Sequence, residues 1–270
     1  MATDRLVDAH VHVASSDEDA FPRQPTGAGS DWWRNESGVE RLHQNLEATG
    51  VEGAVVVQAV GVYGYDCTYV ASVTADDPAL AFVGAIDLSG DDIEADFRTL
   101  ARHDHLGGVR LFGVGAANAE WLTNGAGQLV WSLAAEVGCT LVPTIFSDGL
   151  PALRTLMERT PEVVVAIDHC AFPGFGGPDA MDNLAALAEV PSLHLKVSSH
   201  NLDGEGDPAR FVDTLAEAYG PTRLCWGSDH PQHQSKTYPQ LVELARHAAR
   251  NLDAEHRAGF LGGNTRRLWW

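Results

Sequence analysis

Two histidines separated by one residue, His10 and His12, lie in an apolar segment near the start of the chain. Side chains alternate along an extended strand, so Asp8, His10 and His12 are predicted to share one face, with successive Cα atoms about 7 Å apart. Two imidazoles on one face can converge on one metal ion or one substrate oxygen. The alternative is a pair of histidines satisfied by internal hydrogen bonds. Because an inward face with two histidines makes a poor core, the pattern favours chemistry.

Two later apolar segments end in groups that could join this pair. In the segment 163–170, His169 shares a face with Val165 and Ile167, and it stands at the end of the predicted strand. In the segment 224–230, Asp229 likewise stands at the end of the predicted strand. A carboxylate buried there is costly unless a cation or an imidazolium compensates its charge. A bound metal ion, or a histidine cluster that shares a proton, would do so.

The elements that must position these groups alternate along the chain, because short apolar runs are followed by stretches with helical spacing. The predicted strands are Leu6–Val13, Gly53–Gln58, Leu80–Asp87, Gly108–Phe112, Thr140–Phe146, Val163–Cys170, Leu193–Ser198 and Leu224–His230. The predicted helices include Glu36–Gly50, Asp91–Asp104, Gln128–Gly138 and Tyr238–Leu252.

Eight strands alternating with helices form either an open doubly wound sheet or a closed barrel. The strand count and the 270 residues favour the α/β class with a single (β/α)8 TIM barrel over residues 1–270, whose active site lies at the C-terminal ends of the strands. Closure makes the eighth strand the neighbour of the first, so Asp229 should lie beside His10 and His12.

Residues 14–35 form a segment too long for an ordinary connection between a strand and a helix. It leaves the C-terminal end of the first strand, where barrel active sites lie, so we expect a wall or lid of the active site. Trp32 and Trp33 are its candidate substrate contacts. Packing of both rings in the core is an equally weighted alternative.

Three more residues are candidates for substrate binding, and a fourth for a buried ion pair. Arg110 alternates with apolar neighbours, so it either points inward as a fork for a substrate carboxylate or pairs with an acidic residue of an outer helix. Lys196 is a candidate for a buried ion pair. His200 and His230 are expected to contact substrate, although a solvated loop position is an alternative for His230.

Composition excludes several classes of partner. The chain carries 18 Lys and Arg against 37 Asp and Glu, a formal charge of −19, and this balance disfavours nucleic acid and anionic membranes. Four cysteines without a CxxC pair indicate neither a disulfide framework nor a cysteine zinc site. No apolar run reaches the roughly 18 residues of a membrane span, and no signal peptide is predicted. We expect a cytoplasmic protein with a small-molecule substrate, and a homo-oligomer is left open.

Together, these motifs resemble a known family. They are His10-Val11-His12, Gly108-Val109-Arg110, Ile167-Asp168-His169, Lys196-Val197-Ser198, Gly227-Ser228-Asp229 with Pro231, and Gly263-Asn264 before Arg267-Leu268. They look like the amidohydrolase-2 (amidohydrolase-related) family of the amidohydrolase superfamily. Within it, the chain is most similar to the group of 2-pyrone-4,6-dicarboxylate lactonase and the sugar lactonases, over nearly its whole length.

The resemblance implies a barrel hydrolase with four catalytic residues, His10, His12, His169 and Asp229. The same four would bind one divalent metal ion, with zinc expected, or the histidines would polarise the scissile carbonyl directly. Asp229 would take a proton from the attacking water. In members acting on acidic lactones, the position of Arg110 helps hold a substrate carboxylate.

Two departures from the family pattern matter. The segment 140–146 lacks the histidine or lysine that many metal-dependent members place on strand five, which argues against a binuclear centre and keeps metal-independent catalysis open. His230 stands where an aromatic residue is expected after the strand-eight aspartate, so the substrate could differ from that of the best-known members.

Three functions are therefore compared. The first is a lactonase or carboxylic ester hydrolase that opens a small carboxylated or polyhydroxylated lactone with water activated by Asp229. The second is a metal-dependent decarboxylase of a small carboxylic acid, which the missing strand-five histidine disfavours. The third is a catalytically silent barrel that serves as a binding protein, and the complete set of three histidines and one aspartate disfavours it.

Overall fold

The structure is a computed structural model that describes residues 5–26, 31–114, 119–204 and 206–270. Within the segment 14–35, which the sequence predicts to be a wall or lid, residues 27–30 lie outside the described part.

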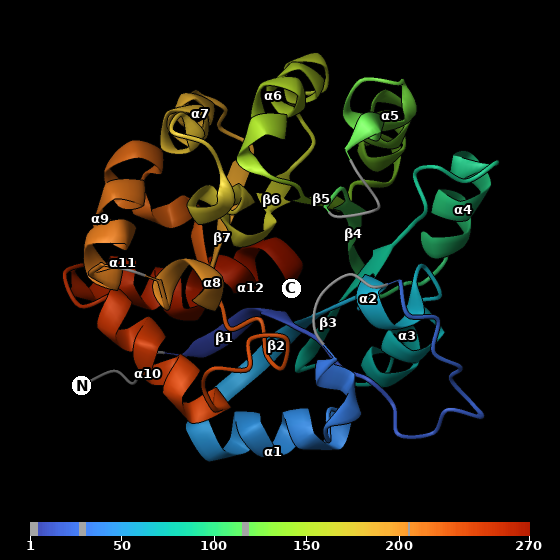
Figure 1. Cartoon of the computed structure of the whole chain (residues 1–270), viewed down its shortest axis with the longest axis horizontal. Coiled ribbons are helices and arrows are strands. Elements are labelled where there is room, and N and C mark those ends of the chain that lie inside the picture. Colours follow the sequence, from blue (N-terminus) through green and yellow to red (C-terminus); the bar gives the residue numbers. More distant parts are fainter. Residues whose placement is uncertain (1–4, 27–30, 115–118, 205) are drawn as a thin grey trace.

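Eight parallel strands form one sheet in sequence order, each paired with the next along the chain. They are β1 (Leu6–Val11), β2 (Val51–Val57), β3 (Leu80–Ala85), β4 (Leu106–Phe112), β5 (Thr140–Thr144), β6 (Val165–Ile167), β7 (Leu193–Ser198) and β8 (Leu224–Gly227). The two ends of the sheet meet, because Asp229 N donates to His10 O at 2.9 Å and His12 N donates to His230 O at 2.7 Å. The predicted (β/α)8 TIM barrel is confirmed (Figure 1).

Helices surround the strands in Figure 1. They are α1 (Val39–Thr49), α2 (Val60–Tyr63), α3 (Thr68–Thr74), α4 (Ile93–Leu100), α5 (Ala126–Val137), α6 (Leu150–Arg159), α7 (Ala180–Ala186), α8 (Ser199–Leu202), α9 (Pro208–Tyr219), α10 (Tyr238–Ala248), α11 (Ala254–Ala258) and α12 (Asn264–Trp269). The four helices predicted from the sequence are α1, α4, α5 and α10, with bounds that differ by a few residues at the ends.

The core has two layers because side chains alternate along the strands. One buried cluster joins members of six strands, and such a cluster can only fill the inside of the barrel: Ala9, Val55, Val57, Ala81, Val83, Val142, Ala166 and Cys225, together with Trp269 of α12. In Figure 1, α12 crosses the middle of the ring of strands, so its Trp269 covers one end of this interior. The larger cluster packs between strands and outer helices.

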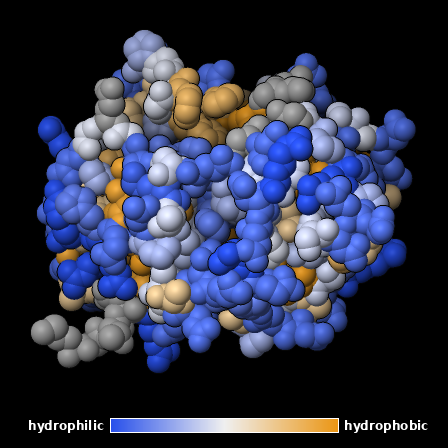
Figure 2. All heavy atoms as spheres, turned by 60° about the horizontal axis from the view of Figure 1, so that its bottom comes forward, coloured by the Kyte–Doolittle hydropathy of each residue, from blue (hydrophilic) through white to orange (hydrophobic). Residues whose placement is uncertain are grey.

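The surface reflects the acidic composition. Figure 2 shows a face that is mostly hydrophilic, with apolar residues gathered at its upper edge. Among the helices of the described residues, none combines the length and the apolar character that crossing a membrane requires.

β1, β3, β5, β6 and β8 end two or three residues earlier than predicted, and the difference matters most for β6 and β8. β6 ends at Ile167 rather than Cys170, and β8 ends at Gly227 rather than His230. The chain leaves both strands through left-handed backbone, with φ near +54° at His169 and +55° at Asp229. These departures from strand geometry decide where the two side chains point.

Candidate active site

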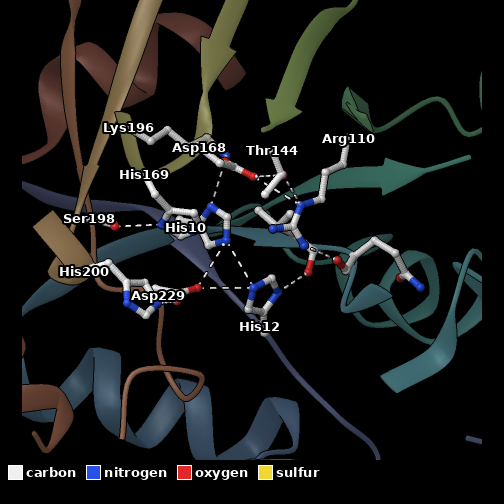
Figure 3. A network of polar contacts seen from close by, with 12 residues as sticks. His10, His12, Arg110, Thr144, Asp168, His169, Lys196, Ser198, His200 and Asp229 are labelled. Carbon is white, nitrogen blue, oxygen red and sulfur yellow. Dashed lines mark hydrogen bonds and ion pairs between the residues drawn. The ribbon is translucent and has the colours of Figure 1, made fainter. Parts of the chain in front are cut away.

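His10 and His12 meet inside the mouth of the barrel, with their Nε2 atoms 3.1 Å apart (Figure 3). His10 Nδ1 lies 3.0 Å from Asp168 Oδ1, and His12 Nδ1 lies 2.8 Å from the carbonyl oxygen of Val57. A carbonyl or an ionised carboxylate only accepts hydrogen bonds, so both Nδ1 atoms carry the hydrogen and both Nε2 atoms present a lone pair in the neutral rings. Burial lowers the pKa of His10 to about 4, which keeps this ring neutral near pH 7.

Asp8 does not share the face of these histidines, and the prediction that it does is wrong. Its Oδ1 accepts from the backbone of His10 and Ser228, and its Oδ2 accepts from Tyr238 Oη on the outer helix α10. The register of β1 against β2 shifts between Asp8 and Val11, so strict alternation fails there. Burial raises the pKa of Asp8 to about 6, and its role is to tie β1 and β8 to α10.

Asp229 completes the cluster, as barrel closure predicts. Its Oδ1 lies 3.4 Å from His10 Nε2 and 3.3 Å from His12 Nε2. Its Oδ2 accepts a hydrogen bond of 2.7 Å from His200 Nε2. Burial alone would raise the pKa of Asp229, but the neighbouring histidines outweigh burial and hold the pKa well below its usual range. The carboxylate is therefore ionised and can accept a proton.

His10 Nε2, His12 Nε2 and Asp229 Oδ1 are thus three acceptor atoms that face one point, with no donor between them. Asp229 Oδ1 is buried and has no hydrogen-bond partner among the described residues. The atoms lie 3.1, 3.3 and 3.4 Å from one another. A tetrahedral ion with ligands at about 2.0–2.1 Å holds its ligand atoms about 3.3 Å apart. His10, His12 and Asp229 therefore fit one divalent ion.

His169 reaches the mouth by a route that strand alternation does not predict. Val165 and Ile167 belong to the outer core layer, whereas Ala166 lies inside the barrel, so a regular strand would turn His169 outward. The left-handed backbone at His169 reverses this direction. Its Nδ1 lies 2.7 Å from Ser198 Oγ, and its ring centroid lies 4.8 Å from that of His10. Its ring therefore lies beside the triangle of acceptor atoms rather than within it.

Asp168 is the main residue that the sequence reasoning missed. It is fully buried, and its oxygens lie 3.0 Å from His10 Nδ1 and 3.1 Å from both Lys196 Nζ and Arg110 Nε. Burial would raise its pKa, but the charges of these partners hold the pKa well below the usual range. Asp168 is two residues after Ala166, and residues two apart on a strand share a face. This alternation could have placed Asp168 inside the barrel. Lys196 forms the predicted buried ion pair.

Arg110 points inward, which is one of the two orientations predicted from the sequence. It pairs with Asp168 inside the barrel rather than with an acidic residue of an outer helix. Its Nε also donates to Thr144 Oγ1 at 2.8 Å, and its Nη1 donates to Gln58 O at 3.1 Å. The same side chain lines the cavity. Arg110 is therefore held in place before any substrate arrives.

The other predicted contacts divide between the cavity and the protein interior. His200 lines the cavity, and its hydrogen bond to Asp229 raises its pKa despite the opposing effect of burial. His230 instead contacts Asn45 of α1 at 3.1 Å and packs on Tyr238 of α10, because the chain turns at Asp229. Trp32, rather than Trp33, lines the cavity, where its ring stacks on His12 at 5.9 Å. Trp33 is buried against Trp32.

The cavity over this cluster has a volume of about 360 Å³. His12, His169, His200, Asp229 and Arg110 form its polar side, and aromatic and aliphatic side chains form the rest. An ionised carboxylate, several imidazole rings and space for a small molecule thus meet at the C-terminal ends of the strands, where barrel enzymes place their chemistry.

The chain is similar to known proteins over nearly its whole length. A family model described as amidohydrolase matches residues 7–269. An L-fucono-1,5-lactonase from Burkholderia ambifaria is 27% identical, over 96% of this chain and 93% of that protein. A structure described as a candidate 2-pyrone-4,6-dicarboxylic acid hydrolase from Pseudomonas putida superposes with a TM-score of 0.80 at 22% identity, over 99% of this chain and 98% of that one. A zinc-bound amidohydrolase from Burkholderia multivorans gives 0.79 at 20% identity, over 98% and 99%.

The family match covers nearly the whole chain and includes every residue of the cluster. The chain belongs to the amidohydrolase family and is a hydrolytic enzyme.

Proposed function

We propose that this enzyme is a lactonase, which opens a small lactone ring by attack of water. The observation that carries the proposal is the ionised Asp229, whose unpartnered Oδ1 faces His10 and His12 on the floor of the cavity. Similarity to a sugar lactonase over 96% of the chain supports the same reaction. The catalytic residues proposed are Asp229, His10, His12 and His169.

His10, His12 and Asp229 would hold one divalent metal ion, and we propose zinc, because imidazole and carboxylate ligands suit it. A bound ion of this kind polarises a carbonyl and lowers the pKa of water. His169, the fourth ligand expected from the resemblance, is not part of the group formed by His10, His12 and Asp229. Its Nδ1 bonds Ser198, and we assign its ring to the wall that faces the scissile carbonyl.

The residues of the chain account for the proton transfers. Asp229 accepts a proton from the attacking water and returns it to the alkoxide when the ring C–O bond breaks, so that lactone and water give a hydroxy acid. His200 holds Asp229 Oδ2 and keeps the carboxylate turned toward the reacting centre. Asp168 orients His10 and anchors Arg110.

We also propose a cytoplasmic location and a small-molecule substrate. The described cysteines Cys67, Cys139, Cys170 and Cys225 are free thiols, as a reducing compartment would keep them. The formal charge of −19 disfavours nucleic acid and anionic membrane surfaces as partners.

An indicator assay tests the reaction. The purified protein is mixed with lactones and with carboxylic acids in weak buffer purged of carbon dioxide, and pH is followed. Hydrolysis of a lactone acidifies the solution, and this is the expected result. If the solution instead becomes alkaline with a carboxylic acid, the enzyme is a decarboxylase, which is the alternative function of the same residues. That result would overturn the lactonase proposal.

A further inference from the structure

The walls of the cavity differ in character from its floor. Above the reacting cluster, Trp32, Phe112, Phe146 and Phe172 contribute rings, and Val60 and Val114 contribute aliphatic groups. The ring centroids of Phe146 and Phe172 lie 5.6 Å apart with planes tilted by 57°. Phe172 also packs on His169 at 4.6 Å. A continuous aromatic surface therefore runs from the reacting histidines to the rim.

Part of this surface is exposed at the mouth. Phe175 is 75% exposed and Phe146 is 39% exposed, although both are large apolar side chains. Phe175 also contacts Phe172, with centroids 6.2 Å apart. Apolar side chains that gather at the rim of a cavity and face water are typical of a ligand site, because a bound apolar group would remove them from water.

The backbone holds this wall in place. The four consecutive residues His169–Phe172 have φ between +50° and +58°, and none is glycine. Such residues rarely adopt left-handed backbone, and a run persists only where its surroundings hold it. The same turn presents His169 and Phe172 to the cavity, so the reacting histidine and the aromatic wall are positioned together.

Polar groups for a sugar are few. Apart from the reacting cluster, the polar side chains among the described lining residues are Arg110, Thr144 and Gln232. Thr144 Oγ1 already donates to Asp168 and accepts from Arg110. Arg110, the permanent cation of the described lining, pairs with Asp168 through Nε and donates Nη1 to Gln58 O. A lactone with several hydroxyl groups would leave some of them without partners, which costs binding energy.

We propose that the rings of Phe146 and Phe172, with Phe112 and Trp32 lining the same cavity, form a subsite for an aromatic ring, and that the substrate is a lactone fused to or carrying such a ring. This inference rests on the proposed lactonase function and narrows its substrate. It departs from the polyhydroxylated lactone, one of the two substrate classes that the sequence predicts. The reason is that the subsite offers ring faces and edges, to which aromatic groups bind in tilted or offset arrangements.

The first experiment compares three six-membered lactones on the wild-type enzyme: 3,4-dihydrocoumarin, δ-valerolactone and glucono-1,5-lactone. Each kcat/KM is divided by the rate constant of hydrolysis by hydroxide, because the phenol leaving group makes dihydrocoumarin intrinsically more reactive. The normalised value for dihydrocoumarin should exceed that for gluconolactone by at least 100-fold, with δ-valerolactone between them. A normalised value for gluconolactone equal to or above that of dihydrocoumarin would overturn the aromatic subsite and leave the lactonase proposal standing.

A matched pair of variants locates the effect. Phe146→Ser removes a ring from the wall, and Leu129→Ser on α5 removes an apolar side chain of similar exposure, 37%, that does not line the cavity. Phe146→Ser should lower the normalised value for dihydrocoumarin about tenfold and change that for gluconolactone less than twofold. Leu129→Ser should change neither. Equal effects of Phe146→Ser on both lactones would count against the subsite.

Binding separates the subsite from the reaction. The lactam 3,4-dihydroquinolin-2-one resembles dihydrocoumarin and resists hydrolysis, so its affinity is measured by calorimetry beside that of gluconolactam. If no lactone is hydrolysed but dihydroquinolinone binds at least tenfold more tightly, and Phe146→Ser weakens it, the subsite is supported while the lactonase proposal fails. If the aromatic lactam binds no better than the sugar lactam, the subsite is overturned.

Discussion

His10 and His12 direct two ring nitrogens at each other across 3.1 Å, and in the neutral rings neither nitrogen carries a hydrogen. Their outer nitrogens are committed to Asp168 and to the carbonyl of Val57. Two lone pairs at this distance repel unless a cation or a proton lies between them. Asp229 adds a third acceptor to the same point, so the cluster is arranged for positive charge.

Replacing Asp229 by Asn should abolish turnover without unfolding the protein. The amide has the same shape but cannot accept a proton from water, so kcat/KM should fall at least about 100-fold. Steady-state kinetics and the thermal unfolding midpoint are measured together, with Asp182→Asn, exposed on α7, as the control. Activity close to that of the wild type would remove Asp229 from the mechanism.

The metal content of the protein should depend on His12. If His10, His12 and Asp229 hold the ion, the purified protein should contain about one divalent ion per chain by elemental analysis, and His12→Asn should lose most of it. The exposed His256→Asn on α11 should retain it. Chelation should lower the unfolding midpoint, because an ion that binds the native state stabilises it. Full activity of wild-type protein that contains almost no metal would contradict this assignment.

Gly227 leaves the space in which His10 sits. A Cβ atom at Gly227 would lie 2.8 Å from His10 Cβ and 3.2 Å from its backbone nitrogen, closer than packed atoms normally approach. Gly227→Ala should therefore displace His10 and reduce both activity and metal content. Gly177→Ala, where an added Cβ meets nothing within 4 Å, is the matched control. If both variants retain wild-type activity, the position of His10 is less critical than this geometry implies.

Asp168 should be essential for stability. Asp168→Asn leaves the charges of Lys196 and Arg110 without their buried partner, and we expect a loss of about 3 kcal/mol in the free energy of unfolding. Urea denaturation measures the change. Glu136→Gln breaks the exposed pair with Arg98 and should leave the midpoint nearly unchanged, because surface pairs contribute little. An equally small effect of Asp168→Asn would show that the buried network relaxes.

Acid sensitivity should depend on His194, which lies on β7 away from the reacting cluster. Burial lowers its pKa to about 4, and the charges of Arg223 and Arg267 add to the effect. The unfolded chain binds a proton there below about pH 6.5 while the folded protein does not, so stability falls as pH decreases from about 6.5 to 4. His194→Gln should reduce the drop in unfolding midpoint between pH 7.5 and pH 5. An unchanged drop would assign the acid sensitivity to other groups.

The barrel and the grouping of His10, His12 and Asp229 follow from the sequence alone. Eight apolar runs separated by helical stretches predict the strands, since burial on both faces requires apolar residues along their length. Closure then makes the first and eighth strands neighbours, which places Asp229 beside His10 and His12 without any knowledge of side-chain packing. The inward direction of Lys196 follows from alternation in the same way, because β7 is regular.

The remaining placements depend on where the backbone leaves regular strand geometry. The register shift in β1 turns Asp8 outward, and the left-handed turn after β6 brings His169 inward and leaves Asp168 inside the barrel. The turn at Asp229 likewise sends His230 to α1, and packing against His12 selects Trp32 over Trp33 for the cavity wall. Alternation is a local rule that holds only while φ and ψ stay extended. These departures are maintained by contacts between distant segments, so only the tertiary structure decides them.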